Sequence, residues 1–455
     1  MLMAPAAWWI VPRATACGPW PFTLPGTGGA CHWLADHGVR TGQRIAVLSS
    51  NCPALCSLIQ ASSIFGIDLV LLNRRLLAHD ITEQLAVLPC DVLIVGSDAQ
   101  PPTGLPLLRL PESFADEALP AIHADDHHAL VVFTSGTSGP AKPIRLPWPR
   151  LRLAAEAARQ HLGLHAEDRW LACLPLDHIG GASLALRAAW SGCHLRLLQR
   201  FDAAAIDADL QSCAITGASL VPTMLHRLIT QRAKQPWPRS LRCLLIGGAA
   251  LSPALADACA ALGLAACATY GLSEAASMAC AQRPTDSHRP AHRVGSPLPG
   301  IELRLLEPDS DGVGIIALRG AHLTPGFEQH WLTTGDLGRL HADGLEVLGR
   351  RDDVIVCGGE KVAPDQVESV LCQHPAIAEA LVAGCPDAEW GQIVVAALVA
   401  RDATPSDAEL SAWLTVHFSS HRRPRRWQWL SELPRTSLGK PQRAAVPSLF
   451  SAGSN

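Results

Sequence analysis

The chain lacks several features that mark common classes of protein. Its fifteen cysteines contain no C-x-x-C pair, which argues against a zinc knuckle or a secreted disulfide framework and favours buried, reduced thiols in a cytoplasmic protein. Its formal charge of −4, with both signs interspersed, gives no basic field for nucleic acid and no polybasic tract for a membrane. Tyrosine occurs once, at Tyr270. These absences leave a small molecule as the expected partner.

Long uninterrupted apolar runs are also absent. The longest apolar region, 56–72, contains Gln60, three serines, Gly66 and Asp68, so it fits a core helix running into a strand better than a membrane span. The apolar start at 1–11 has no basic leader and no small-residue cleavage site, so a signal peptide is not expected. We therefore expect neither a membrane span nor export, and homo-oligomerisation stays open.

The chain does show a regular alternation of β-rich runs with helical stretches rich in alanine and leucine. Examples are the runs at 44–48 and 129–133 and the helical stretches at 151–162 and 253–262. This alternation predicts an α/β fold with largely parallel strands. We expect a large N-terminal body over 1–351, with a β-rich subdomain at about 295–350, and a small α+β C-terminal domain over 352–455.

A loop rich in hydroxyls and glycine follows the apolar run at 129–133. Glycines let backbone N–H groups turn toward an anion, and the lysine that ends the loop supplies a point charge, so the pattern predicts a phosphate cradle. It departs from the common nucleotide loop, because Ala141 replaces the second glycine and Pro143 replaces the magnesium-binding hydroxyl. A plain surface connection is the alternative. The loop consists of Thr134, Ser135, Gly136, Thr137, Ser138, Gly139, Pro140, Ala141 and Lys142.

Two further segments also follow apolar strands. The small residues Gly247, Gly248 and Ala249 would let a flat ring lie against backbone, although a tight strand-to-helix turn has the same composition. The segment T-Y-G-L-S-E at 269–274 combines an aromatic face, a hydroxyl and a carboxylate, which can stack a base, contact a phosphate and hold Mg²⁺. Ordinary capping of a helix is the alternative there.

The last two segments are weaker by themselves. Asp336 follows Gly335 and could accept hydrogen bonds from a ribose diol, and the sequence G-R-R-D-D follows at 349–353. A turn in a β-meander would look similar. Near the C-terminus, P-R-T-S-L-G-K at 434–440 presents Lys440 on a loop, where a solvated lysine is the common explanation.

In this order and at these separations, the five segments resemble the adenylate-forming superfamily of acyl-CoA synthetases, adenylation domains and luciferases. The resemblance covers the chain from about residue 44 onward and implies ATP, Mg²⁺ and CoA as cofactor and cosubstrates. It implies that Glu274 holds Mg²⁺, that Lys440 bridges the attacking carboxylate and the α-phosphate, and that the small C-terminal domain is mobile, with Asp352 as its hinge. The residues implied around ATP are Thr134 to Gly139, Lys142, Gly247, Gly248, Ala249, Tyr270, Gly271, Ser273, Asp336 and Arg350, and those implied near the CoA tunnel are Gly358, Gly359 and Lys361.

A narrower resemblance lies between these segments. The stretch L-P-L-D-H-I-G-G-A-S at 174–183, and the segments at 219–223, 247–250 and 294–300, resemble 2-succinylbenzoate–CoA ligases of menaquinone or phylloquinone biosynthesis. The resemblance implies His178 as a gate beside the acyl pocket. Arg187 interrupts an apolar helical run, one turn after Ser183 on the same face, and is our candidate for recognising the carboxylate that does not react. Equally, Arg187 could snorkel to the surface or pair with a structural carboxylate.

Two departures and several alternatives remain. Pro143 removes an N–H that many relatives have after the loop lysine, and the segment before about residue 44 does not resemble the usual opening of the family, so its packing is open. A ligase for a fatty or aryl acid, or an adenylation domain that loads a carrier protein, would keep the shared segments. A catalytically silent binding module is disfavoured, because Glu274, Asp336 and Lys440 are all retained.

Overall fold

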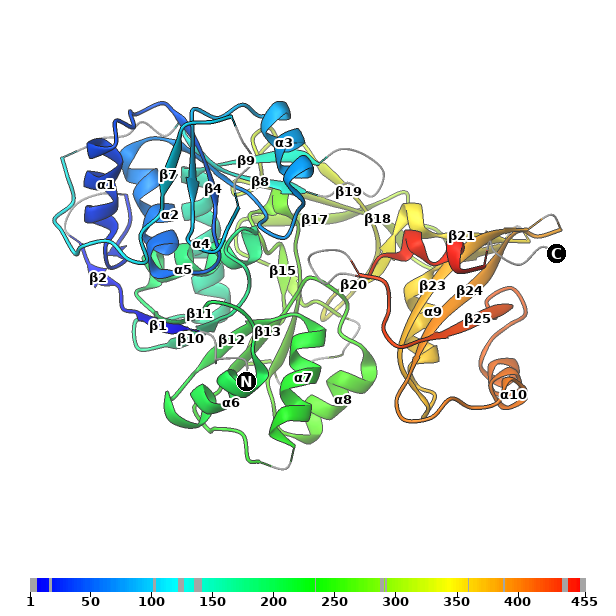
Figure 1. The fold of residues 1–455 in the computed structure, drawn as a ribbon. Coiled ribbons are helices and arrows are strands. Elements are labelled where there is room, and N and C mark those ends of the chain that lie inside the picture. Colours follow the sequence, from blue (N-terminus) through cyan, green and yellow to red (C-terminus); the bar gives the residue numbers. More distant parts are fainter. Residues whose placement is uncertain are drawn as a thin grey trace.

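The computed structural model describes residues 6–15, 19–100, 104–121, 127–134, 141–233, 235–286, 290, 293–358, 360–387, 389–435 and 441–450. They form a large N-terminal body and a smaller C-terminal part beside it (Figure 1). The predicted α/β class, with an N-terminal body and a C-terminal domain, is confirmed. The boundary at 351/352 stays a prediction.

The first sheet of the body carries the hairpin that ends in the proposed phosphate cradle. Its strands are β4 (Arg44–Leu48), β5 (Asp68–Leu71), β6 (Val92–Val95), β7 (Leu107–Arg109), β8 (Ala129–Thr134) and β9 (Lys142–Pro147). They lie in the order β7-β6-β4-β5-β8-β9, and the neighbours are parallel except β8 and β9, which pair antiparallel. The apolar run at 129–133 is therefore a buried strand that leads into the cradle, as predicted.

The second sheet places the carboxyl ends of several parallel strands at one edge. Its strands are β1 (Ala7–Ile10), β10 (Arg169–Ala172), β11 (His194–Leu198), β12 (Gly217–Leu220), β13 (Cys243–Ile246), β14 (Ala266–Tyr270), β15 (Cys280–Ala281) and β16 (Ser296–Pro297). The order is β1-β11-β10-β12-β13-β14-β15-β16, with β11 to β14 parallel along the sheet. The N-terminal segment, whose packing the sequence left open, adds β1 antiparallel to β11.

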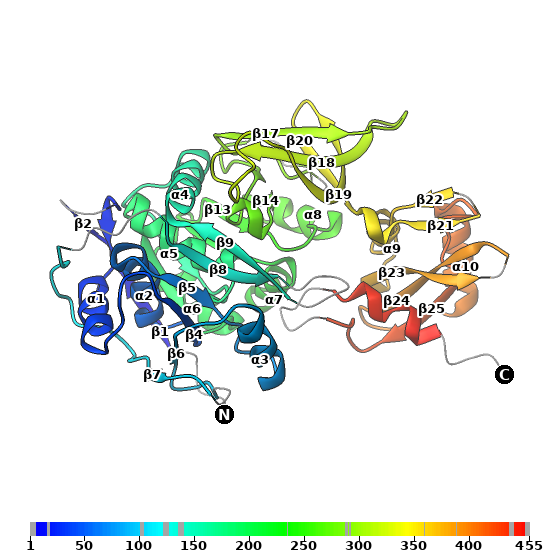
Figure 2. The same cartoon turned by 90° about the horizontal axis from the view of Figure 1, so that it is seen from above.

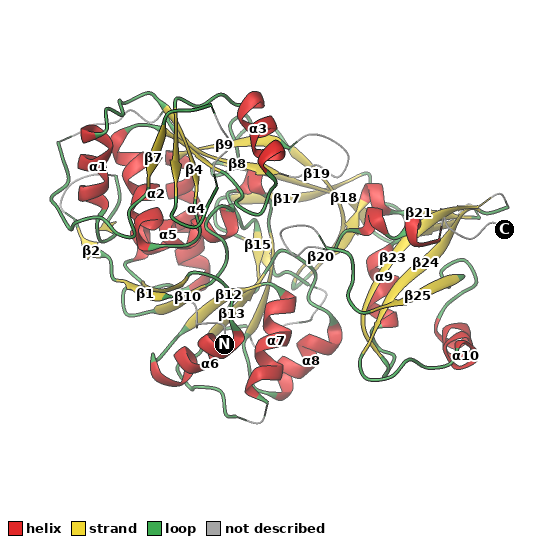
Figure 3. Ribbon diagram, viewed as in Figure 1, coloured by secondary structure: helices red, strands yellow, loops and turns green. Residues whose placement is uncertain are grey.

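Helices separate and cover the two sheets (Figure 3). Strand alternation sends Ile45 and Trp170, from different sheets, into one core shared with α2, α4 and α5. The opposite faces pack against α3 in the first sheet and against α6, α7 and α8 in the second. The body helices are α1 (Thr27–Asp36), α2 (Pro53–Phe65), α3 (Ala78–Val87), α4 (Trp148–Leu162), α5 (Ile179–Ser191), α6 (Ala203–Ser212), α7 (Pro222–Arg232) and α8 (Pro253–Ala261).

An antiparallel sheet completes the body, where a β-rich subdomain was predicted, and leads to the C-terminal part, as Figure 2 shows from above. It consists of β17 (Ile301–Leu306), β18 (Val313–Gly320), β19 (Leu332–His341) and β20 (Gly344–Arg350). The C-terminal part contains β21 (Ile355–Cys357), β22 (Glu360–Val362), α9 (Pro364–Leu371), β23 (Ile377–Asp387), β24 (Gly391–Ala400), α10 (Asp407–His417) and β25 (Arg426–Leu430). It has apolar cores of its own, built from its strands and both helices.

Two sequence-based expectations concern the apolar region 56–72 and the cysteines. The region 56–72 is largely a core helix and a strand, α2 and β5, and no helix in the described part of the chain is long and apolar enough to cross a membrane. The cysteines within the described residues are all free thiols, and most are buried. Burial raises the pKa of several of these thiols, for example that of Cys31 to about 12, which agrees with thiols that serve as small apolar side chains.

Candidate active site

The two ends of the predicted phosphate cradle, Thr134 and Lys142, are the last residue of β8 and the first residue of β9. Thr134 pairs with Lys142 across the hairpin, and the Thr134 hydroxyl donates a hydrogen bond of 3.3 Å to the Lys142 carbonyl. The Lys142 side chain is exposed. The hairpin therefore sets the two ends of the cradle side by side. Of the cradle residues between them, Ser135, Gly136, Thr137, Ser138, Gly139 and Pro140 lie outside the described residues, whereas Ala141 is described.

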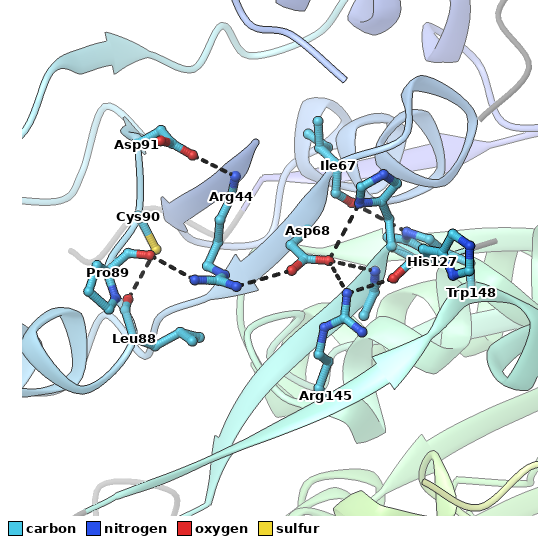
Figure 4. Close-up of polar contacts among 12 residues, drawn as sticks. Arg44, Ile67, Asp68, Leu88, Pro89, Cys90, Asp91, His127, Arg145 and Trp148 are labelled. Carbon is cyan, nitrogen blue, oxygen red and sulfur yellow. Dashed lines mark hydrogen bonds and ion pairs between the residues drawn. The ribbon is translucent and has the colours of Figure 1, made fainter. Parts of the chain in front are cut away.

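A buried carboxylate fastens this hairpin to the sheet (Figure 4). Asp68, at the start of β5, accepts hydrogen bonds of 2.9 Å from the backbone N–H of Ala129 and from Arg145, on the two arms of the hairpin. Arg44 on β4 stands 3.5 Å from the other carboxylate oxygen, and His128 stands 3.8 Å from the first. Sequence reasoning treated Asp68 only as an interruption of an apolar run and missed this role, because Asp68 and Arg145 lie 77 positions apart.

The segment with the proposed magnesium ligand is a tight turn after β14. A 3-10 turn, η1 (Ser273–Ala275), packs against β9, so Glu274 lies beside the hairpin that carries the cradle. A side chain at Gly271 would place its Cβ 1.5 Å from the Ser277 carbonyl oxygen, so only glycine lets the turn fold back. The Glu274 carbonyl accepts a hydrogen bond of 2.8 Å from the Thr324 N–H, which fixes the turn.

The Glu274 carboxylate fits a magnesium ion that is completed by phosphate oxygens. It is half-buried, and it makes no hydrogen bond or ion pair with any other described residue. No cluster of three or more metal-binding side chains occurs among the described residues. Mg²⁺ is commonly held by one or two carboxylates together with substrate phosphates and water, which is what a single carboxylate beside a phosphate cradle provides.

The structure brings Tyr270, Asp336 and Arg350 together. The Tyr270 hydroxyl donates a hydrogen bond of 2.6 Å to Asp336 Oδ2, and Arg350 Nε lies 3.4 Å from Asp336 Oδ1. Tyr270 ends β14, whereas Asp336 and Arg350 are direct partners on β19 and β20. Burial and the neighbouring Asp336 charge raise the pKa of Tyr270, so the phenol keeps its proton at neutral pH. The predicted ribose and adenine residues are therefore neighbours.

The predicted adenine segment lies at the same edge of the second sheet. Gly247, Gly248 and Ala249 directly follow β13, next to the ends of β12 and β14, and the last two are exposed. The Gly247 N–H donates to the Leu220 carbonyl at 3.1 Å. Ligands of open α/β sheets bind beyond the carboxyl ends of parallel strands, which is where these residues and Tyr270 lie.

Arg187 and Ser183 line one cavity, as the helical spacing predicts. The cavity lies between α4 and α5 and is closed by Ala276, Met278 and Leu298. Arg187 is only 6% exposed, and its guanidinium has no hydrogen bond or ion pair with another described residue. Burial lowers the pKa of Arg187 to about 10. Of the alternatives left open above, the structure contradicts both the snorkelling side chain and, within the described residues, the structural ion pair.

The only acidic residue on the two helices beside Arg187 is occupied elsewhere. Glu156 on α4 accepts a hydrogen bond of 2.6 Å from Arg159 and another of 2.6 Å from the Trp190 indole. These donors hold the pKa of Glu156 at about 2. Glu156 thus fastens α4 to α5 and does not pair with the buried guanidinium of Arg187, which has no carboxylate partner among the described residues. A buried cation in this state favours an anionic ligand.

His178 lies at the start of α5, in a different hollow from Arg187. Its Nε2 lies 3.5 Å from Asp177 Oδ1, and both residues line a hollow with Asn51, Arg74 and Arg75. Burial raises the pKa of Asp177, and His178 opposes that effect. A Cβ at Gly181 would stand 2.0 Å from the Pro175 carbonyl oxygen, so glycine lets this turn approach α5. The hollow that His178 lines is not the cavity that Arg187 lines. The role of His178 as a gate stays a prediction.

The C-terminal candidates are only partly described. Asp352 lies exposed in the turn η2 (Arg351–Asp353). Gly358 follows β21, and its N–H donates to the Trp390 carbonyl at 2.9 Å. Gly359 and Lys440 lie outside the described residues, and of Lys361 only the backbone in β22 is described. The base of the Lys440 loop is described, because Arg435 and Pro441 pair in an antiparallel bridge.

Arg443, three residues beyond Lys440, was missed by sequence reasoning. Its Nε lies 3.2 Å from Asp353, and its other nitrogens bond Asp365, Glu368 and the Val382 carbonyl. Three carboxylates thus surround one guanidinium. Burial raises the pKa of Glu368 to about 7, and nearby Asp365 adds to the effect while Arg443 opposes it. A lone arginine in a polar segment gives no sequence signal for such a cluster.

The structure is an α/β body in which the turn that carries Glu274 lies beside the β8–β9 hairpin and follows Tyr270, the hydrogen-bond partner of Asp336; a separate C-terminal part follows this body. The family models agree: residues 30–327 match the AMP-binding enzyme model, and residues 366–440 match the AMP-binding enzyme C-terminal domain. The chain belongs to the AMP-binding enzyme family.

Individual relatives are similar over nearly the whole chain. A 2-succinylbenzoate–CoA ligase of Bacillus cereus is 33% identical and covers 92% of this chain and 91% of its own length. Among solved structures, the o-succinylbenzoate CoA synthetase of Bacillus subtilis in complex with its acyl-adenylate intermediate is 28% identical, with a TM-score of 0.84, over 94% of this chain and 92% of that one. The same enzyme with ATP and a magnesium ion gives a TM-score of 0.82 at 28% identity, over 92% of each chain.

Proposed function

We propose that the protein ligates 2-succinylbenzoate to CoA at the expense of ATP, through an acyl-adenylate, with release of AMP and pyrophosphate. One observation carries the choice of acid: the buried Arg187 guanidinium has no partner among the described residues and faces a cavity. An acid with two carboxylates supplies one to react and one to meet Arg187. Relatives named 2-succinylbenzoate–CoA ligase, alike over 92% of the chain, support the same acid.

The first half-reaction makes the carboxylate a competent electrophile. A carboxylate oxygen attacks the α-phosphorus of ATP, and pyrophosphate leaves. We propose that the loop from Thr134 to Lys142 binds the β- and γ-phosphates, that Ser273 lies close to the α-phosphate, and that Lys440 bridges the carboxylate and the α-phosphate. Bound at Glu274, Mg²⁺ would offset phosphate charge. These residues act by positioning and by stabilising charge, because the bond changes involve only the two substrates.

The nucleoside part of ATP fits the residues at the sheet edge. We propose that Gly247 to Ala249 and the ring of Tyr270 contact adenine. Gly271 lets the turn after Tyr270 fold back against Ser277. Asp336 accepts from the ribose hydroxyls, with Arg350 beside it. The observed grouping of Tyr270, Asp336 and Arg350 supports this assignment.

In the second half-reaction the CoA thiol attacks the acyl carbon and AMP leaves. We propose a boundary between 351 and 352, with Asp352 as the hinge about which the C-terminal domain turns after adenylation. That motion withdraws Lys440 and brings Gly358, Gly359 and Lys361 toward the CoA tunnel, while His178 gates the acyl pocket. The thioester would serve menaquinone or phylloquinone biosynthesis in the cytoplasm.

Substrate profiling tests the proposal. The purified protein is given ATP, Mg²⁺ and CoA with 2-succinylbenzoate, benzoate or octanoate, and AMP release is measured. We expect 2-succinylbenzoate to be turned over much faster than the other two acids. Equal or better turnover of octanoate would reject the assigned acid, and AMP release without formation of a CoA thioester would favour a carrier-loading enzyme.

A further inference from the structure

The Tyr270 hydroxyl does not point into solvent or toward an apolar wall; it is bonded to Asp336. The bond of 2.6 Å is shorter than a typical bond between neutral hydroxyl and oxygen groups, as expected when the acceptor is charged. Tyr270 is 8% exposed, so the bond is shielded from water. A phenylalanine would offer the same aromatic face to a base, so stacking alone does not require this hydroxyl.

Asp336 has a second neighbour that competes for it. Arg350 is its direct cross-strand partner, yet Arg350 Nε stays 3.4 Å from Asp336 Oδ1, which is longer than a good charge-assisted hydrogen bond. The Arg350 side chain is 46% exposed, whereas that of Asp336 is 14% exposed. The carboxylate therefore sits against the tyrosine and makes only a loose pair with the arginine.

We infer that Tyr270 is a positioning residue that holds the Asp336 carboxylate away from Arg350 and so sets the selectivity of the site for the ribose hydroxyls of the nucleotide. The inference rests on the proposed ribose contact of Asp336. Without the phenol, rotation of the carboxylate toward Arg350 would close the ion pair and move the acceptor oxygens away from the ribose. Since its raised pKa keeps the phenol protonated at neutral pH, Tyr270 remains a donor to Asp336.

The local backbone supports a fixed carboxylate. The Thr334 hydroxyl donates to the Ile316 carbonyl at 2.9 Å and accepts from the Asp336 N–H at 3.2 Å, which ties the turn before Asp336 to the neighbouring strand. The backbone of Asp336 is thus held by Thr334 and its side chain by Tyr270. This division predicts that loss of the phenol changes the direction of the carboxylate and leaves the strand in place.

Nucleotide binding to the full chain tests the inference without any acid substrate. Calorimetry measures the Kd of ATP and of 2′-deoxy-ATP for the wild type and for Tyr270→Phe. For the wild type we expect 2′-deoxy-ATP to bind about 10- to 100-fold more weakly, the effect of one charge-assisted hydrogen bond. For Tyr270→Phe we expect this ratio to fall below about 3-fold, while the ratio of the Kd values for ATP and ITP, which reports on the base, stays unchanged.

Two comparisons separate positioning from a structural role. Ser63→Ala removes the buried hydrogen bond of 2.7 Å from the Trp20 indole, and it should lower stability while leaving the ribose ratio intact. In an Asp336→Asn background, Tyr270→Phe should change the ratio no further, because Tyr270 acts through the carboxylate. An unchanged ratio in Tyr270→Phe would overturn the inference, as would a wild type that binds both nucleotides equally. Failure to turn over 2-succinylbenzoate would reject the proposed acid alone, because the binding ratios are measured without any acid.

Discussion

Replacing Arg187 with methionine should make the protein more stable and less active. The guanidinium is charged at neutral pH in both the folded and the unfolded chain, because pH 7 lies below both pKa values. Burial lowers the pKa of folded Arg187 to about 10, well below the ordinary value of a guanidinium; since each pKa unit corresponds to about 1.4 kcal/mol, burying the charge costs about 3 kcal/mol. This cost applies in full below the folded pKa and declines as pH rises through it. Methionine fills similar space without a charge.

We therefore expect Arg187→Met to raise the free energy of unfolding of the ligand-free protein by up to about 3 kcal/mol in chemical denaturation. Arg159→Met on the neighbouring helix is the matched control. Arg159 is 39% exposed and paired with Glu156, so its loss should lower stability slightly. The opposite signs of the two changes would attribute the gain to removal of a buried charge without a partner, and not to methionine as such.

The same variant should change the choice of acid. 3-Benzoylpropionate keeps the succinyl carboxylate of 2-succinylbenzoate and lacks the carboxylate on the ring. In Arg187→Met, kcat/KM for 2-succinylbenzoate should fall by about 100-fold or more, since a buried carboxylate left unpaired costs about 3 kcal/mol or more. The value for 3-benzoylpropionate should hold or rise. A variant that is less stable than the wild type and equally impaired with both acids would refute the reasoning.

Other predictions concern the two domains separately. Lys440→Ala should lower adenylation by about 100-fold or more and spare thioester formation from a supplied adenylate; an equal loss in both half-reactions would contradict the hinge scheme. Asp68→Ala should lower stability by about 3 kcal/mol in denaturant and raise the KM for ATP, because the hairpin loses its anchor on both arms; an unchanged KM would leave the anchor a purely structural role. Folded Glu368, with its pKa raised from 4.5 to about 7, keeps a proton that the unfolded chain releases, so stability should fall as pH rises from about 5 to 7. Glu368→Gln should flatten that fall in a denaturation series, and an identical slope in both proteins would count against it.

Local sequence patterns were enough to predict secondary-structure elements, but they did not predict which residues far apart in the sequence pair with each other. The strand at 44–48 and the start of α10, where Ser406 and Glu409 form a capping box, can be predicted because apolar runs and caps are written in adjacent residues. The proximity of Asp336 and Arg350 was expected only because the resemblance to the family implied that both lie around ATP. Arg443 and Asp353 lie 90 positions apart, and no spacing rule connects them.

In the candidate site too, features that depend on local spacing could be predicted, and features that depend on distant residues could not. The helical spacing of Ser183 and Arg187 predicts a shared face, and the structure places both on one cavity. That Arg187 has no carboxylate partner among the described residues could not be predicted, because it depends on Glu156 being bonded to Arg159 and Trp190. The bond from Tyr270 to Asp336 joins a β14 residue to a different sheet, so it emerges only from the fold.

The strand β1 has a consequence for how the protein should be handled. It lies along β11 at the end of the second sheet, and Trp9 there lies beneath the guanidinium groups of Arg169 and Arg196. Removing residues 6–12 would leave the backbone N–H and C=O groups of β11 without these partners. An uncovered strand edge is a template for strand addition between chains. Versions of the chain that lack residues 6–12 are therefore expected to aggregate through β11.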